Sequence, residues 1–275
     1  MKEIKKFAVI GSPVKHSLSP KIHSHFAEKL GIPVSYEAVQ VEKINFLSSV
    51  QELFEEGYSG INVTLPLKEE AYKFADSLSE EALLSESVNT LWKQDNSLIY
   101  ADTTDGRGLI KDFLRKNIEL KGLKILILGA GGSAKAITPE LLNNNPHSVV
   151  IANRTIEKAE LLLKRFSSLH DNLQTMSLSD EIAFKPDLII NTSSAGILGQ
   201  GIEFPDNIFS DEAIVYDLSY SAGNTPFVDL ALSKGVKKCY DGIGMLIEQA
   251  ALSFEIWTQQ RPDTELSKDM LFRYF

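Results

Sequence analysis

The segment KILILGAGGSA, residues 124–134, decides the fold class of this chain. Its opening run Lys124–Leu128 is nearly all apolar, as in a parallel strand that is buried on both faces. Gly129, Gly131 and Ala134 then follow the spacing G-x-G-x-x-A, which joins a strand to a helix in dinucleotide-binding folds. The N–H groups at the start of such a helix bind pyrophosphate. A tight turn alone would need fewer small residues, so the pattern favours a dinucleotide site.

Strand and helix patterns alternate over the whole chain of 275 residues, a length typical of about two domains. We predict an α/β protein with an N-terminal open α/β domain and a Rossmann-type doubly wound domain. The apolar run from Met245 to Gln259 predicts a C-terminal helix that packs back on the first domain. The expected first domain is therefore 1–105 with 243–275, and the expected second domain is 106–242.

Hydrophobic periodicity and turn residues predict the individual elements. The expected strands are 7–10, 34–41, 60–64, 88–92, 98–101, 124–128, 149–152, 188–191, 214–218 and 238–240, with a turn at 94–96. The expected helices are 20–30, 44–54, 68–78, 109–116, 157–166, 227–234 and 245–259, with a further helix after the glycine-rich segment.

Composition and charge exclude several classes of protein. The chain has 28 basic and 37 acidic residues and a net charge of −9, so we expect no nucleic-acid partner. Cys239 is the single cysteine, which excludes an internal disulfide, and His16, His23 and His25 lack the spacing of metal ligands. No apolar run approaches the ~20 residues of a membrane span. We expect a soluble cytoplasmic protein without metal, a monomer or homodimer with no membrane partner.

The end of the second strand of the dinucleotide domain indicates which cofactor binds. An NAD site usually has an acidic residue there, which accepts hydrogen bonds from the ribose. The segment 149–156 contains no acid, and Arg154 and Lys158 supply positive charge instead. Because both side chains bind phosphate, the pattern favours NADP with its 2′-phosphate. The alternative is that both are ordinary surface residues at a helix start.

Three segments outside the dinucleotide loop carry side chains suited to chemistry. Ser17 and Ser19 can bind one carboxylate, although spacing alone favours Ser19 as the N-cap of a helix. Lys68 follows a strand end, where open α/β sheets place their sites, and the alternative is a solvated lysine. Asp102 and Asp105 offer two carboxylates, and the alternative is a turn with a helix cap.

Nine short motifs in one order give the chain a resemblance to a known family. They are SLSP, NVTLPLK, VNT, TDG, GAGG, NRT, NTSSAG, Tyr-x-x-x-x-Thr-Pro and GxGMLIEQA, and they span nearly the whole chain. In this order they resemble the shikimate dehydrogenase family. The resemblance implies an N-terminal substrate domain and an NADP-binding Rossmann domain. It also implies the reversible NADPH-dependent reduction of 3-dehydroshikimate to shikimate in aromatic amino acid biosynthesis.

The resemblance implies a role for individual residues as well. Lys68 and Asp105 form the catalytic pair beside the ketone that is reduced. An ammonium suits this place because hydride addition makes an alkoxide, which needs stabilisation and a proton. Ser17 and Ser19 bind the substrate carboxylate. The other residues implied to hold substrate or shape its pocket are Asn62, Thr64, Asn89, Tyr220 and Gln249. Those implied to hold NADP are Gly129, Ala130, Gly131, Gly132, Ser133, Asn153, Arg154, Thr155, Lys158, Leu218 and Gly242.

Two positions depart from the family pattern. Thr103 stands where the family often has Asn, so an amide near the site is lost. Lys158 stands where the family often has Arg, and it lacks the bidentate grip of a guanidinium on phosphate. A quinate/shikimate dehydrogenase with broader substrate or cofactor use remains an alternative. So does a non-catalytic NADP-binding regulator, although that alternative predicts loss of Lys68 or Asp105, and both are present.

Overall fold

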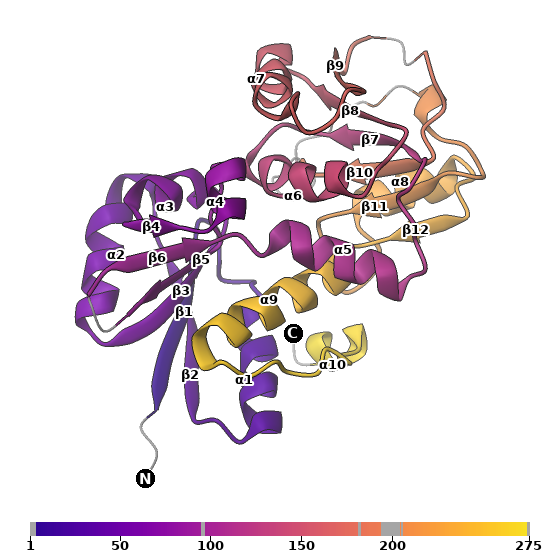
Figure 1. The fold of residues 1–275 in the computed structure, drawn as a ribbon. Coiled ribbons are helices and arrows are strands. Elements are labelled where there is room, and N and C mark those ends of the chain that lie inside the picture. The colour runs from indigo at the N-terminus through magenta and orange to yellow at the C-terminus, as the bar shows by residue number, and fades with distance from the viewer. Residues whose placement is uncertain (1–3, 95–96, 181–182, 194–203, 205, 274–275) are drawn as a thin grey trace. The chain divides into compact units, whose positions relative to one another are not determined.

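The chain forms two compact units in its structure, a computed structural model (Figure 1). Unit 1 consists of Met1–Lys111 with Leu246–Phe275, and unit 2 consists of Asp112–Met245. The turn expected at 94–96 and the NTSSAG motif lie partly outside the described residues. The residues that the structure describes are 4–94, 97–180, 183–193, 204 and 206–273.

Unit 1 contains a mixed sheet with the strand order β2-β1-β3-β5-β6-β4 among its described residues. Strand β1 pairs in parallel with β2 and β3, whereas β5 is antiparallel to both β3 and β6. The sheet is therefore parallel in its β2-β1-β3 half, and the antiparallel hairpin β5–β6 continues it on the other side of β3. The strands are β1 (Lys5–Gly11), β2 (Val34–Gln40), β3 (Tyr58–Val63), β4 (Ser77–Leu78), β5 (Thr90–Lys93) and β6 (Ile99–Asp102).

Alternating residues of β1 build a core on each face of this sheet. Ala8 and Ile10 join a cluster that includes Val50 of helix α2, and Phe7 packs with Trp257 of helix α9 on the other face. This alternation follows from the two-residue period of a strand. The helices of unit 1 are α1 (Ser19–Leu30), η1 (Lys43–Asn45), α2 (Phe46–Glu55), α3 (Lys68–Phe74), α4 (Glu80–Ser85), α5 (Asp105–Arg115), α9 (Ile243–Thr258) and α10 (Lys268–Phe272), of which α5 and α9 begin or end in unit 2.

Helix α9 packs closely on the sheet of unit 1, as the sequence predicts for the C-terminal helix. The rings of Phe7 and Trp257 stack with their centroids 4.5 Å apart, and the Trp257 indole donates to the carbonyl of Leu91 at 3.2 Å. A Cβ at Gly60 would lie 2.4 Å from Nε1 of Trp257, so only glycine fits at this approach. Gly108 of α5 likewise leaves room for the backbone of α9.

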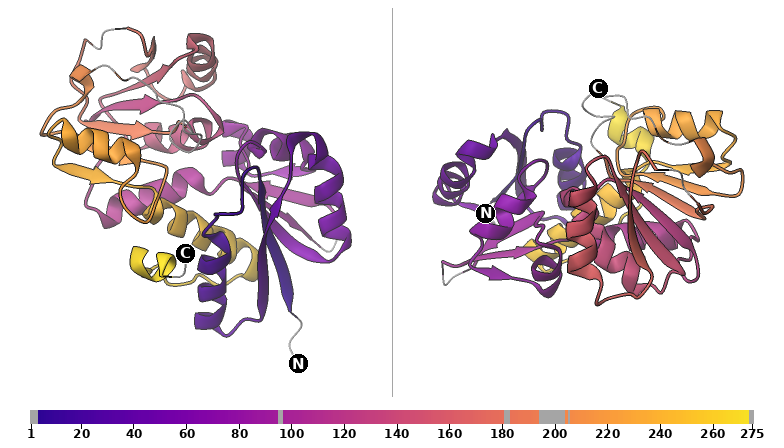
Figure 2. Two further views of the ribbon diagram at one scale, coloured as in Figure 1. Left: turned by 180° about the vertical axis from the view of Figure 1, so that it is seen from behind. Right: turned by 90° about the horizontal axis from the view of Figure 1, so that it is seen from above.

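Unit 2, coloured from magenta to orange in Figure 2, contains a parallel sheet. Its strand order among the described residues is β12-β11-β10-β7-β8-β9. Counted from β7 outward, this is the strand order 3-2-1-4-5-6 of Rossmann folds. The predicted fold class is confirmed. The elements of unit 2 are β7 (Lys124–Leu128), α6 (Gly132–Asn143), β8 (Ser148–Asn153), α7 (Ile156–Phe166), β9 (Leu173–Ser177), β10 (Leu188–Asn191), η2 (Asp206–Ile208), β11 (Ile214–Asp217), α8 (Pro226–Ser233) and β12 (Lys238–Tyr240).

The helix expected over 68–78 is wrong in its second half. Helix α3 ends at Phe74, because Ala75 is extended and the next residues join the sheet beside β6. Ser79 then caps the separate helix α4 by accepting a hydrogen bond from the N–H of Ala82 at 3.1 Å. The short elements β9 and α10 were not predicted.

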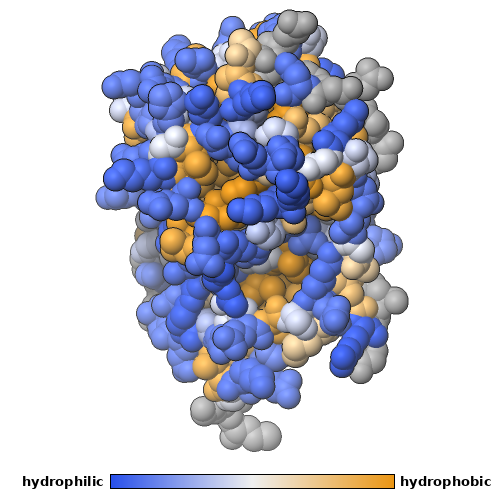
Figure 3. All heavy atoms as spheres, turned by 90° about the vertical axis from the view of Figure 1, so that its right-hand side faces the viewer, coloured by the Kyte–Doolittle hydropathy of each residue, from blue (hydrophilic) through white to orange (hydrophobic). Residues whose placement is uncertain are grey.

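Among the described residues, no helix has both the length and the apolar character needed to cross a membrane. On the face drawn in Figure 3, hydrophilic side chains surround hydrophobic patches of limited extent.

Candidate active site

Lys68 and Asp105 form a buried ion pair in unit 1. Lys68 is the first residue of α3, directly after the loop that follows β3, and Asp105 is the first residue of α5. Their side chains are 10% and 6% exposed, so the alternative of a solvated lysine is wrong. The helix dipole favours a carboxylate at the first turn of α5. The pair places an ammonium beside a fixed carboxylate with little water around it.

Asn89, just before β5, links this pair to helix α9. Its side-chain amide donates to Oδ1 of Asp105 at 3.0 Å, to Oε1 of Gln249 at 3.0 Å and to the Thr104 hydroxyl at 2.8 Å. Its side-chain oxygen, Oδ1, accepts a hydrogen bond from the backbone N–H of Thr104 at 2.9 Å. Because both ends of the amide are bonded and buried, Asn89 has one fixed orientation.

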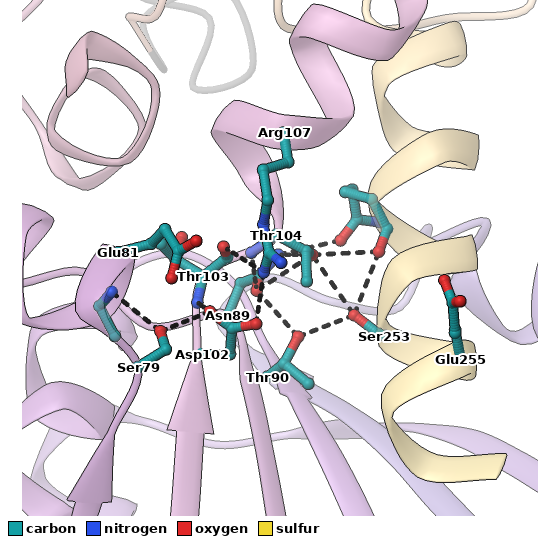
Figure 4. A network of polar contacts seen from close by, with 12 residues as sticks. Ser79, Glu81, Asn89, Thr90, Asp102, Thr103, Thr104, Arg107, Ser253 and Glu255 are labelled. Carbon is teal, nitrogen blue, oxygen red and sulfur yellow. Dashed lines mark hydrogen bonds and ion pairs between the residues drawn. The ribbon is translucent and has the colours of Figure 1, made fainter. Parts of the chain in front are cut away.

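Three hydroxyl groups complete the surroundings of Asn89 (Figure 4). The hydroxyls of Thr90 and Ser253 lie 2.7 Å apart. The hydroxyl of Thr104 donates to the backbone carbonyl of Gln249 at 3.0 Å. Sequence reasoning missed all three. Thr90 and Thr104 lie inside the VNT and TDG motifs, and Ser253 lies one helical turn after Gln249. These positions were the available signal.

Asn62, at the end of β3, is fully engaged by protein groups. Its carbonyl oxygen accepts from the phenol of Tyr36 at 2.8 Å. Its NH₂ group donates to the backbone carbonyl of Asn89 at 3.0 Å and to the hydroxyl of Ser253 at 3.0 Å. Burial raises the pKa of Tyr36 well above its ordinary value, so this phenol keeps its proton.

Ser17 lies in the loop between β1 and α1, Ser19 is the first residue of α1, and Thr64 directly follows β3. Helix α1 begins at Ser19, and the residue before it, Leu18, makes no side-chain cap. Ser19 is therefore not the N-cap; instead its N–H donates to the hydroxyl of Ser17 at 3.2 Å. Ser17 and Thr64 are half-buried, and Ser19 is buried. Hydroxyls in this setting suit a carboxylate or a sugar-like hydroxyl.

The glycine-rich segment of unit 2 has the geometry of a phosphate-binding loop. Gly129 directly follows β7 with a φ of +110°, and a Cβ there would lie 2.6 Å from the hydroxyl of Thr192, so glycine is required. Gly131 is exposed, and a Cβ there would meet nothing within 4 Å. Helix α6 starts at Gly132 without a side-chain cap; Ser133 lies in its first turn, and Ala130 precedes the cap residue Gly131. The residues present fit a pyrophosphate at this helix start.

The carboxyl end of β8 carries the expected positive charge. Asn153 ends the strand and donates to the carbonyl of Thr155 at 2.7 Å, which shapes the turn into α7. Arg154 and Lys158 are exposed, and within the described part of the chain no ion pair engages either one. These two cations fit the 2′-phosphate of NADP.

The segment after β11 is held by the buried carboxylate of Asp217. This group accepts from the N–H of Ser219 at 3.1 Å and from the hydroxyl of Thr225 at 2.6 Å. Burial raises the pKa of Asp217. A Cβ at Gly242 would lie 2.1 Å from the carbonyl oxygen of Leu218, so Gly242 allows the chain to pass there. Tyr220 lies in the same segment and is half-buried.

The structure thus brings Lys68, Asp105, Asn89, Gln249 and Asn62 into one bonded network within unit 1. The implied NADP residues and Tyr220 lie in unit 2. Among the described residues, no cluster of three or more His, Cys, Asp or Glu side chains could hold a metal ion.

Family models match the chain in three consecutive segments. Residues 9–91 match the shikimate dehydrogenase substrate binding domain, and residues 112–241 match the model described as shikimate / quinate 5-dehydrogenase. Residues 242–266 match the shikimate 5′-dehydrogenase C-terminal domain. The chain belongs to the shikimate dehydrogenase family.

Individual members of the family cover almost the full chain. A shikimate dehydrogenase (NADP(+)) of Vibrio atlanticus is 45% identical over 96% of this chain and 95% of its own length. The shikimate 5-dehydrogenase of Thermus thermophilus, solved with NADP(H) and shikimate, is 32% identical with a TM-score of 0.85, over 98% of this chain and 99% of that one. That of Listeria monocytogenes, solved with shikimate and NAD, is 28% identical with a TM-score of 0.85, over 99% and 98%.

Proposed function

We propose that this chain catalyses the reversible NADPH-dependent reduction of 3-dehydroshikimate to shikimate, a step toward the aromatic amino acids. The observation that carries the proposal is the buried Lys68–Asp105 ion pair, held by Asn89, in a member of this family. In our assignment, residues 1–105 with 243–275 bind substrate, and residues 106–242 bind NADP.

Lys68 is the proton donor in the direction of reduction. Bound NADPH supplies the hydride for the ketone carbon. The Lys68 ammonium donates a hydrogen bond to the ketone oxygen and gives it a proton as negative charge develops there. Asp105 holds the ammonium in place and accepts a hydrogen bond from a neighbouring ring hydroxyl. In the oxidation of shikimate, the neutral amine of Lys68 takes the hydroxyl proton back.

The remaining polar groups orient the substrate. Ser17 and Ser19 bind its carboxylate, because two hydroxyls next to one helix start can donate to the same group. Asn89 and Gln249 present amide groups beside Asp105 and bind ring hydroxyls. Thr64 and Tyr220 also contact the substrate. Asn62 helps to shape the pocket through its hydrogen bond to Asn89.

The loop from Gly129 through Ser133 holds the pyrophosphate of NADP. Arg154 and Lys158, with Asn153 and Thr155 shaping the turn, bind the 2′-phosphate. Leu218 and Gly242 lie along the nicotinamide in this proposal.

The test follows NADPH oxidation by the purified protein with 3-dehydroshikimate, in parallel with 3-dehydroquinate and with NADH. Fast turnover with NADPH and 3-dehydroshikimate alone supports the proposal. Comparable rates with 3-dehydroquinate or NADH would indicate the broader quinate/shikimate dehydrogenase. A folded protein that binds NADPH but is inactive in every combination would indicate the non-catalytic regulator.

We further propose that the enzyme acts in the cytoplasm as a monomer or homodimer. The acidic net charge of −9 supports solubility. Sedimentation velocity at several protein concentrations distinguishes the two states, and a larger assembly would contradict the proposal.

A further inference from the structure

Tyr36 of β2 lies at the far end of the hydrogen-bonded network that contains the catalytic pair. Its side chain is on the face of the sheet that packs against Trp257, and the residue is only 8% exposed. Its O–H donates to the carbonyl oxygen of Asn62 at 2.8 Å. No motif of the sequence pointed to it, since it lies in an ordinary alternating strand.

Aromatic neighbours fix the ring of Tyr36. The imidazole of His23 stacks on it with ring centroids 4.2 Å apart and an interplanar angle of 10°. Trp257 packs at 6.4 Å from the same ring, and His23 itself is fully buried. Close packing against these two rings restricts the movement of the Tyr36 ring, whose hydroxyl is directed at Asn62.

The backbone carbonyl of Asn89 decides which way the Asn62 amide faces, and the phenol of Tyr36 stabilises that orientation. The backbone carbonyl of Asn89 can only accept, so the NH₂ group of Asn62 must face it, at 3.0 Å. The oxygen of Asn62 must then face Tyr36, which is the donor there. Without that donor, the buried oxygen of Asn62 would lose this hydrogen bond, and the preference for this orientation would weaken.

The bonds continue from Asn62 to the reacting groups without a gap. Asn62 donates to the backbone carbonyl of Asn89, whose side-chain amide donates to Asp105 at 3.0 Å. Asp105 forms the ion pair with Lys68. This series of hydrogen bonds therefore connects Tyr36, through Asn62 and Asn89, to the catalytic pair.

We propose that Tyr36 is a positioning residue that holds Asn89, and through it the Lys68–Asp105 pair, in the productive geometry. The inference rests on the function proposed above. Tyr36 touches neither substrate nor cofactor in this proposal. It acts by orienting Asn62, and its effect therefore falls on turnover and substrate binding and leaves cofactor binding unchanged.

The deciding comparison is Tyr36→Phe against Tyr58→Phe. Each change removes one phenol oxygen from the sheet of unit 1 and keeps the ring. Tyr58 donates to Glu37 and packs in the cluster on the opposite face, outside the network. Any general effect of losing a tyrosine hydroxyl from this sheet is common to both variants.

The first readout needs no activity. Hydrogen exchange of the Asn89 side-chain amide, followed by NMR, is expected to be slow in the wild type and in Tyr58→Phe. In Tyr36→Phe we expect it to speed up by about tenfold or more, because the amide opens more often. Equal exchange in the two variants would overturn the inference, whatever reaction the protein catalyses.

The second readout is kinetic. For Tyr36→Phe we expect kcat with 3-dehydroshikimate to fall about tenfold while KM for NADPH stays within about twofold. Tyr58→Phe should match the wild type within about twofold. A merely structural role would lower the melting temperature without this split, so a loss of stability with unchanged kcat contradicts the inference.

Asn62→Asp decides the matter if Tyr36→Phe does not fold. An aspartate at 62 still accepts from Tyr36 but cannot donate to the carbonyl of Asn89, so Asn89 exchange should rise and kcat should fall as above. Unchanged exchange and kcat would overturn the inference. A wild type inactive with 3-dehydroshikimate would contradict the proposed function instead, and Asn89 exchange would still test Tyr36.

Discussion

Asn89 donates its side-chain amide to Oε1 of Gln249 at 3.0 Å, across 160 positions of sequence. The same amide contacts Asp105 at 3.0 Å, so helix α9 is bonded to the group that partners Lys68. The C-terminal helix is thus part of the candidate active site as well as a cover for the sheet. Any change that shifts α9 should disturb catalysis before it unfolds the protein.

Lys68→Ala should lower kcat by about 10²- to 10⁴-fold, the range for removal of a general acid. The dissociation constant of shikimate should change by less than roughly tenfold, because the lost interaction is strongest in the transition state. Steady-state kinetics and calorimetry measure the two quantities. Lys73→Ala, an exposed lysine at the other end of α3, is the matched control. Weakened binding with turnover retained would make Lys68 a binding residue.

Arg154→Ala should raise KM for NADPH by about tenfold or more and leave KM for NADH nearly unchanged, because only NADPH carries the 2′-phosphate. Lys158→Arg should lower KM for NADPH, since it adds a bidentate donor. Lys164→Ala, exposed in the last turn of α7, serves as the control. An equal effect of Arg154→Ala on both cofactors would show that the assignment of the phosphate site is wrong.

Thr103→Val should leave the free energy of unfolding unchanged or raise it by about 1 kcal/mol. The hydroxyl of Thr103 is buried and has no hydrogen-bond partner among the described residues, so its removal relieves a desolvation cost. Thr104→Val is the matched comparison, since it breaks the bond to Gln249 and should cost about 1–3 kcal/mol. Urea unfolding measures both. A clear loss in Thr103→Val would reveal a partner for this hydroxyl.

His23 should make the protein less stable as the pH falls below its ordinary pKa. Burial lowers the pKa of His23 from 6.5 to about 3, so the folded protein keeps it neutral. The unfolded chain takes up a proton below pH 6.5, hence this contribution is fully present above 6.5 and declines between 6.5 and 3.

Proton uptake by His23 in the unfolded chain should lower the free energy of unfolding by about 2 kcal/mol between pH 7 and pH 5. His23→Phe keeps an aromatic ring beside Tyr36 but cannot take up the proton. Its free energy of unfolding should therefore decline less over this range. Urea unfolding of both proteins at the two pH values gives the difference, and parallel declines would contradict the buried neutral state.

Local patterns predicted much of the fold for clear physical reasons. The strand at 124–128 is buried on both faces and so carries an apolar run, and glycine at 129 is needed for a positive φ. By contrast, β4 has only two residues and cannot show a period, and β9 has one buried residue in five. Neither strand therefore shows a hydrophobic period. Strand β4 lies within the range 68–78, where a single helix was predicted.

The candidate site was predicted mainly from its motifs, since no local pattern reports contacts between distant residues. Lys68 alone resembles any surface lysine until Asp105 is brought beside it. Ser253 shows in the sequence only as a serine one helical turn after Gln249, because its role depends on a hydroxyl 163 positions away, that of Thr90. The resemblance supplied residue identities, and the structure supplied the bonds among them.

The return of α9 to unit 1 also orders events during synthesis of the protein. Residues 1–111 leave the ribosome first, yet their sheet lacks Trp257 on one face and Gln249 beside Asn89 until α9 has been made. Unit 2 is continuous in sequence and can complete its own sheet earlier. In a nascent chain, unit 2 can therefore fold before unit 1, which carries the catalytic pair, is complete. Premature termination within α9 would yield a protein able to fold around a dinucleotide but unable to catalyse.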